Sequence, residues 1–187
     1  MSHSLFRVLA PALVCAALAA PAAAQTPSPA QSGLMGDLLK DVSEAKGKIV
    51  GLAKAMPEAA WDWRPGPGVR STKEVFVHLT GDNYFIPVGA GSTAPAASGI
   101  GEDYKTVEAF EKRTRTREQV IAELDASFAF LEQQMTATTD AKLATPSKWP
   151  KTSTRQLWIA ATTHLHEHLG QLIAYARSNK VTPPWSK

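Results

Sequence analysis

Residues 163–177 contain three histidines, and two of them have the spacing of metal ligands on a helix. A helix turns about 100° per residue, so His164 and His168 lie one turn apart on one face, and His166 falls on the opposite side. Imidazoles in this arrangement let a helix offer two nitrogen ligands to one ion. The H-E-x-x-H zincin motif is absent, because Leu165 stands where its general base would be. Two ligands do not complete a site, so a third must come from another segment.

His78 is the candidate for the third ligand. It shares the inward face of a predicted helix with Val75 and Leu79. A lone histidine among apolar neighbours is more often a hydrogen-bonded core residue than a ligand. A helical bundle brings the inward faces of distant helices together, so we expect His78, His164 and His168 to converge. Convergence favours a metal site of three imidazoles. The alternative is three histidines that are hydrogen-bonded in the core without a metal.

Three polar residues near these histidines are candidates for further roles. Asp82 lies one turn beyond His78 on the same face. It is a candidate fourth ligand, orienting partner of an imidazole or proton acceptor, and the alternative is a solvated carboxylate near a helix end. Glu167 lies to one side of the ligand face and either orients a ligand or acts as a base. Gln171 follows His168 by three residues and either packs or bonds to a neighbouring group.

The rest of the sequence restricts the ligands to nitrogen and oxygen. The single cysteine, Cys15, lies in an N-terminal segment that we expect to be removed. A histidine-only ligand set suits a divalent ion such as zinc, nickel, iron or manganese, and ligand type does not choose among them. Three imidazoles leave positions open for substrate, which is typical of a catalytic site. An ion held in this way polarises a carbonyl or lowers the pKa of a bound group.

The N-terminal segment has the pattern of a secretory signal peptide. Residues 1–24 contain Arg7, then an apolar, alanine-rich run and small residues that end at Ala24. This pattern predicts cleavage after Ala24. The apolar run is too short to span a bilayer comfortably, and Val14 stands before Cys15 where a lipoprotein cleavage motif needs a small residue. We therefore expect an exported protein, periplasmic or secreted, with no membrane anchor after cleavage.

Size and charge of the mature chain narrow its class and its partners. Residues 25–187 comprise 163 residues, enough for one domain with a self-sufficient core. The formal charge of +3 includes Arg7, so the mature chain is near +2. This charge is too small to favour nucleic acid or an anionic membrane as a partner, and we expect a small-molecule substrate. Residues 25–31 read as a flexible leader and residues 32–187 as the folded domain.

Four long helices are predicted after the leader. Apolar residues at spacings of three and four predict helices over 32–56, 72–86, 116–135 and 153–178. No stretch alternates with period two, so the predicted fold class is all-α. Pro57 and Pro87 are expected to end the first two helices. The last three helices begin with capping boxes, formed by Ser71 and Glu74, Thr116 and Gln119, and Ser153 and Gln156.

The connections predict how the helices are joined. Residues 89–101 are too irregular for a regular element, and such a span suits a four-helix bundle with one long crossover between its second and third helices. Residues 104–111 predict a short helix within it. Residues 57–70 and 138–152 read as loops. Trp61 and Trp63 in the first loop either line a pocket or close the end of the core, and the second role is commoner.

Two smaller features also carry expectations. The basic run at 112–117 could bind an anion, but acidic neighbours favour a solvated charged face. Gly170, between the histidines and Gln171, is expected to permit close approach of a neighbouring helix.

These residues together resemble the DinB-like (DinB/YfiT-like) family. The resemblance rests on FVHLTGDNYF around His78, on THLHEHLGQLIAYAR, and on the WRPGPGVRS run before the second helix, and it covers essentially the whole mature chain. It implies a four-helix bundle with a long crossover, a divalent metal held by His78, His164 and His168 at one end of the bundle, and a homodimer.

The resemblance also suggests an activity. Some members of the family use the metal to activate a thiol cofactor for transfer or isomerisation, whereas the export signal here departs from the cytoplasmic members. We therefore expect a metal-dependent hydrolase or transferase that acts on a small substrate, with Asp82 and Glu167 as catalytic groups. The alternative is a non-catalytic metal-binding or ligand-binding bundle of the cell envelope.

Overall fold

The computed structural model describes residues 33–186, and these residues form helices joined by loops. Among them no β-strand is present, apart from an isolated bridge between Pro146 and Ser153, so the predicted all-α class is confirmed. The predicted signal peptide and leader lie outside the described residues. The long helices are α1 (Leu34–Ala55), α2 (Thr72–Gly89), α4 (Arg117–Thr136) and α6 (Thr154–Ser178). The short ones are α3 (Lys105–Glu111) and α5 (Asp140–Leu143), with the 3₁₀ turns η1 (Glu58–Ala60) and η2 (Ala96–Ser98).

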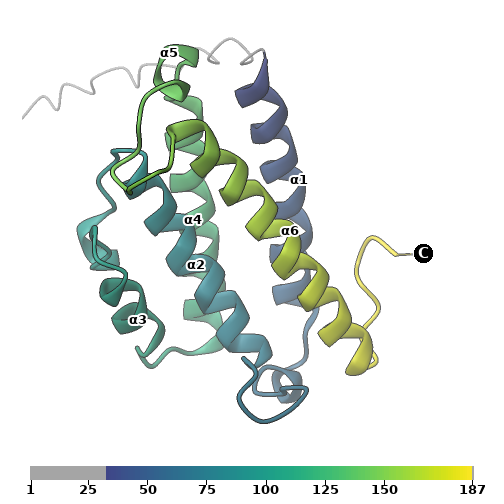
Figure 1. Ribbon diagram of the computed structural model, residues 1–187. Helices are drawn as coiled ribbons and strands as arrows, with labels where there is room; N and C mark the ends of the chain where they lie inside the picture. Colours follow the sequence, from purple (N-terminus) through teal and green to yellow (C-terminus); the bar gives the residue numbers. More distant parts are fainter. Residues whose placement is uncertain (1–32, 187) are drawn as a thin grey trace, which may run out of the picture.

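The four long helices pack side by side. Helix α2 contacts α4 and α6, and α1 contacts the same two helices from the other side. In the view of Figure 1, α1 and α6 run downward whereas α2 and α4 run upward. Two consecutive long helices that run the same way need a long return connection between them. The segment between α2 and α4 provides it and packs α3 against α2.

The helix starts agree with the capping signals. Ser71, Thr116 and Ser153 each accept a hydrogen bond from the backbone N–H three residues on, and Glu74, Gln119 and Gln156 bond back to the cap residue. Such reciprocal bonds satisfy N–H groups that the first turn of a helix leaves free. All three predicted capping boxes are therefore confirmed.

One helix end differs from its prediction. Helix α2 continues through Pro87 to Gly89, whereas Pro87 was expected to end it. A proline removes its own N–H donor and crowds the carbonyl four residues earlier, but the N–H groups that follow it in the last turn can still form hydrogen bonds. The N–H of Ala90 indeed bonds to the carbonyl of Ile86 at 3.3 Å. The predicted loop 138–152 likewise contains the one-turn helix α5.

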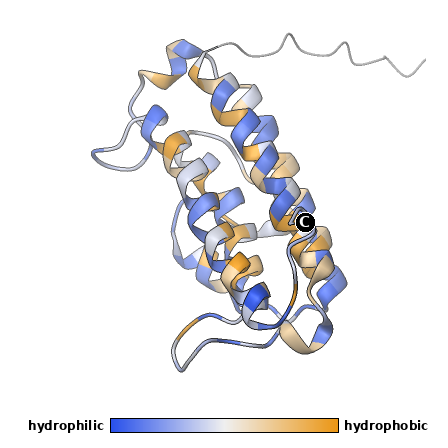
Figure 2. Ribbon diagram, turned by 90° about the vertical axis from the view of Figure 1, so that its right-hand side faces the viewer, coloured by the Kyte–Doolittle hydropathy of each residue, from blue (hydrophilic) through white to orange (hydrophobic). Residues whose placement is uncertain are grey.

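The core lies between the long helices and is closed at one end by Trp61. Apolar and polar patches are interspersed along each helix in Figure 2, as expected when one face of a helix is buried and the other is in solvent. Trp61 is 2% exposed, lies 5.3 Å from the ring of Phe76 between centroids, and donates a hydrogen bond to the carbonyl of Met56. Trp61 thus closes the core. Among the helices of residues 33–186, none combines the length and hydropathy needed to cross a membrane.

The arginines of the basic run make structural contacts. Arg113 is still exposed, as expected, whereas the expected solvated face is wrong for the buried Arg115 and the partly buried Arg117. Arg117 donates to the carbonyls of Ala53, Lys54 and Met56 at the end of α1, and Arg113 donates to those of Ala97 and Ser98 in η2. Arg115 is buried, with its guanidinium 4.1 Å from the centre of the Phe110 ring. The last carbonyls of a helix lack partners within the helix, and a cationic donor satisfies them well.

The close approach expected at Gly170 occurs elsewhere. Gly170 is exposed, and a Cβ added there would meet nothing within 4 Å. At Gly89, in the last turn of α2, a Cβ would lie 2.8 Å from the Trp149 ring and 3.0 Å from Leu157. The packing therefore needs a glycine at the end of α2 and not in the middle of α6.

Candidate metal centre

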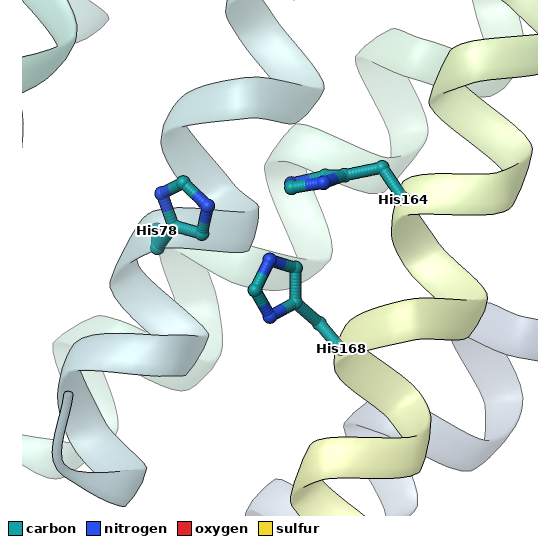
Figure 3. Close-up of side chains that lie close together, drawn as sticks. All are labelled: His78, His164 and His168. Atoms are coloured by element: carbon teal, nitrogen blue, oxygen red, sulfur yellow. The ribbon is translucent and has the colours of Figure 1, made fainter. Parts of the chain in front are cut away.

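His78 from α2 and His164 and His168 from α6 face one another across the gap between the two helices (Figure 3). Their ring centroids are 4.4–5.2 Å apart, and one ligand nitrogen of each lies within 4.8 Å of the other two. His78 is buried, whereas the other two are partly buried. His166 points away, with its Nε2 atom 3.0 Å from a carboxylate oxygen of Asp41 in α1. The three inward histidines converge, and the fourth does not.

The opposed directions of α2 and α6 bring these residues to the same level of the bundle. The start of α2 meets the end of α6, where the Tyr175 hydroxyl donates to the carbonyl of Arg70 at 3.1 Å. The capping boxes at Ser71 and Ser153 mark where each helix begins. Starting points and direction together set His78 opposite the turn of α6 that carries the histidine pair.

Asp82 is a buried member of the same group. Its Oδ2 atom lies 2.9 Å from Nε2 of His164 and 3.3 Å from Nε2 of His78, and the residue is 8% exposed. The alternative of a solvated aspartate near a helix end is therefore wrong, because α2 continues past this point and packs against α4 and α6.

Glu111, the last residue of α3, contacts the His78 ring at Nδ1, on the side away from the other histidines. Its Oε1 atom lies 2.7 Å from Nδ1 of His78 and 3.6 Å from the guanidinium of Arg70. A carboxylate only accepts hydrogen bonds, so Nδ1 of His78 carries the proton. Nε2 is then the nitrogen of His78 that would bind an ion placed between this ring, Asp82 and the other two histidines. The sequence did not identify Glu111, because nothing local to α3 indicates which side of α2 the crossover follows.

A second chain of hydrogen bonds sets the ring of His168. The carbonyl of Arg70 only accepts, so Tyr175 donates its proton to it and accepts from the Gln171 amide at 2.9 Å. The amide oxygen of Gln171 is thereby directed to Nδ1 of His168, 2.8 Å away. This nitrogen must donate, which leaves Nε2 of His168 with a free lone pair. Gln171 thus bonds to a histidine of the cluster instead of only packing.

Electrostatics favour the neutral form of His168. Burial lowers its pKa below the ordinary value, the Gln171 hydrogen bond raises it by less, and the neighbouring His164 and His78 lower it further. Neutral imidazole is the form that binds a metal ion. The surroundings of His168 therefore favour the ligand form.

The donor set fits a divalent first-row ion. Within residues 33–186, Nε2 of His164 is a buried nitrogen without a hydrogen bond of acceptable geometry, although Asp82 is close. Such an atom is costly unless a partner is supplied. Three imidazole nitrogens and an adjacent carboxylate are ligands that zinc and its neighbours accept. His78, His164 and His168 could therefore hold one ion.

A cavity of about 380 Å³ opens beside these residues. Asp82, His164 and Glu167 contribute to its lining, and Glu167 is exposed. The two carboxylates that the sequence singled out thus border the same space as one of the histidines. A small molecule in this cavity would touch all three side chains.

The fold and the site define a class of protein, an all-α bundle in which three histidines converge. The family within this class follows from a comparison of the sequence. The profile of the DinB superfamily matches residues 42–172, a span that includes the histidines, Asp82, Glu111 and Gln171. The chain therefore belongs to the DinB superfamily.

Solved structures agree with this assignment. A DinB-like protein from Bacillus subtilis, YjoA, is similar with a TM-score of 0.61 and 14% identity, covering 78% of this chain and 94% of that one. A protein assigned to the DinB family from Exiguobacterium sibiricum gives a TM-score of 0.59 and 22% identity, covering 79% and 92%. At these identities the likeness establishes the shared fold. No curated protein matches the sequence.

Proposed function

We propose that this protein is an exported, divalent-metal-dependent enzyme, a hydrolase or transferase that acts on a small molecule. The observation that carries the proposal is the group of three imidazole nitrogens within 4.8 Å of one another, with Asp82 against two of the rings and a cavity at its side. Partly accessible ligands next to a space for substrate suit a catalytic site better than a closed structural one.

His78, His164 and His168 would hold the ion, which would supply Lewis-acid chemistry by polarising a bound carbonyl or lowering the pKa of a bound group. Asp82 accepts a proton at Oδ2 from the reacting group, because this oxygen is the acceptor nearest to two of the rings. Glu167 borders the outer part of the cavity, where it orients a polar group of the substrate or passes a proton to solvent.

The alternative is a non-catalytic metal-binding bundle, and the position of Asp82 favours it. If Asp82 completed a four-donor set, the site would be closed in the manner of a structural zinc site. The two alternatives differ in whether the loaded protein has a free coordination position. Acetohydroxamic acid, a small chelating ligand, binds an open site and does not bind a closed one.

The metal content of untagged mature protein tests the site itself. We expect about one ion per chain by inductively coupled plasma mass spectrometry, since three imidazoles suffice to retain a divalent ion. His78→Ala should lose the ion, because two ligands remain. His166→Ala is the matched control and should keep it, because this ring faces Asp41.

Circular dichroism of each variant separates loss of metal from loss of fold. Absence of metal after reconstitution with zinc, nickel, iron and manganese would contradict the proposal. Equal loss in the His78 and His166 variants would contradict the assignment of the faces.

Export is part of the proposal and is supported by the N-terminal sequence. Residues 1–24 combine a basic start, an apolar run and a small-residue end. The substrate would then be a molecule that reaches the cell envelope or the medium.

A further inference from the structure

The cavity beside the histidines has an apolar side as well as a polar one. Asp82, Thr163, His164 and Glu167 form the polar side. Its volume of about 380 Å³ falls within the range of small-molecule sites. The apolar side is lined by Phe85, Ile86, Tyr104, Trp149, Leu157 and Ala160.

Three aromatic rings from separate segments make up most of this apolar side. Phe85 belongs to α2, Tyr104 precedes α3, and Trp149 precedes α6. The rings of Phe85 and Trp149 are stacked with centroids 4.7 Å apart, and Tyr104 meets Phe85 edge-on at 5.4 Å. Tyr104 is 44% exposed and Trp149 is partly buried, so aromatic surface remains open toward the cavity. We call these three rings the aromatic wall.

Hydrogen bonds and close packing hold the Trp149 part of the aromatic wall in place. The N–H of Lys148 donates to the carbonyl of Gly89 at 2.9 Å, and the N–H of Trp149 donates to the Ser147 hydroxyl at 3.1 Å. The absence of a side chain at Gly89 lets the Trp149 ring lie directly on the end of α2. A surface that is already ordered loses little entropy when a ligand binds.

The charges around the cavity restrict the ligand further. The lining carries two carboxylates, Asp82 and Glu167, and no lysine or arginine. The cations gather instead in a separate cavity of about 720 Å³ on the far side of Glu111, which includes Arg64, Arg70, Lys73, Lys112 and Arg113. An additional negative charge on the ligand near Glu167 would be repelled.

We propose that the substrate is a small molecule with a flat aromatic body, neutral or cationic apart from the group that meets the metal, which lies against Phe85, Tyr104 and Trp149 and directs its polar group toward His164 and Asp82. This inference rests on the proposed function and adds the class of substrate to it. Aromatic rings of a ligand and of the protein attract beyond the burial of area alone, and a cationic group gains from the ring faces as well.

Two hydroxamic acids with the same chelating head test the aromatic wall. Metal-loaded protein is titrated by calorimetry with acetohydroxamic acid and with benzohydroxamic acid, which adds an aromatic ring. We expect the aromatic acid to bind on the order of tenfold more tightly, as a ring contact of ordinary strength predicts. In Trp149→Leu this preference should largely disappear while the affinity for acetohydroxamic acid is unchanged. Trp185→Leu, at an exposed tryptophan outside the cavity, is the matched control and should keep the preference.

Two ligands of opposite charge test the predicted preference for a neutral or cationic substrate. Benzohydroxamic acid with a 4-aminomethyl group should bind several-fold more tightly than the 4-carboxy compound, and Glu167→Gln should narrow the difference. Stronger binding of the 4-carboxy compound would overturn the charge preference. If circular dichroism shows that Trp149→Leu is misfolded, Tyr104→Leu, at a partly exposed ring, takes its place.

The outcomes separate this inference from the function on which it rests. Equal affinity for the two unsubstituted acids in metal-loaded protein would overturn the aromatic substrate and leave an open metal site. Failure of both acids to bind would overturn both proposals, because the site would then be closed.

Discussion

At the scale of single residues, the centre depends on which nitrogen of each ring carries the proton. Glu111 accepts a hydrogen bond from Nδ1 of His78, and Gln171 accepts one from Nδ1 of His168. In each ring Nε2 is therefore the nitrogen left to bind a metal ion. The two chains of contacts meet at Arg70, through its guanidinium on one side and its carbonyl on the other.

Two substitutions of Gln171 distinguish its role as a hydrogen-bond acceptor from its role in filling space. Gln171→Ala should weaken metal affinity by roughly 10–100-fold, as loss of a partner behind a ligand histidine usually does. Gln171→Glu should remain near the wild-type value, because a carboxylate still accepts from Nδ1 of His168. Competition with a chromophoric chelator measures both affinities.

The control for this pair is Gln133→Ala, which removes an exposed glutamine of α4 and should leave metal affinity unchanged. Equal losses in the alanine and glutamate variants of Gln171 would mean that the residue only fills space. No loss in either would mean that the ring of His168 is held without it.

At the scale of helices, α2 is the element around which the others are arranged. It packs against α3, α4 and α6, and most of its residues are buried. This burial gives α2 a weak amphipathic pattern, whereas α1 and α6 each leave one face in solvent. A helix surrounded in this way can carry His78 and Asp82 inside the bundle, because their polar atoms meet partners from α3 and α6.

Two glycine substitutions should have opposite effects on stability. Gly89→Ala forces a Cβ to within 2.8 Å of the Trp149 ring, and overpacking of this kind lowers the free energy of unfolding by about 1–3 kcal/mol. Gly170→Ala meets nothing within 4 Å on an exposed turn of α6 and should raise it by up to about 1 kcal/mol.

Urea denaturation of both variants at neutral pH measures the change. A gain in stability for Gly89→Ala would show that the loop carrying Trp149 moves to make room for the added methyl group at little cost in free energy. A loss for Gly170→Ala would restore a packing role for that residue.

At the scale of the whole molecule, stability rests on the apolar core. Each of the four long helices contributes to the core, as do Trp61 and the segment around α3. The only cysteine, Cys15, lies outside the described residues and within the predicted signal peptide. A chain of about 160 residues buries enough surface to fold without disulfides.

The proposed export and the redox behaviour of the mature chain can be checked together. The intact mass of protein recovered outside the cytoplasm should correspond to residues 25–187, because the cleavage pattern ends at Ala24. Its thermal midpoint should be the same with and without a reductant, since no thiol remains. A mass that includes residues 1–24, or a midpoint that falls on reduction, would contradict the predicted cleavage.

The sequence by itself determined what depends on neighbours three or four residues apart. It identified the all-α class, the three capping boxes and the shared face of His164 and His168, because helical geometry fixes these relations locally. It also indicated that His78 would face the same interior, since Val75 and Leu79 set the inward side of that helix.

Only the tertiary structure decided what depends on the paths between the helices. The crossover brings Glu111 behind His78, carries Arg113 to η2, and leads to Arg117 beneath the end of α1, so a basic run that looks solvated becomes structural. The need for glycine at Gly89 likewise arises from Trp149, 60 residues further along the chain. Contacts of this kind follow from how loops pack, and no periodicity in the sequence encodes them.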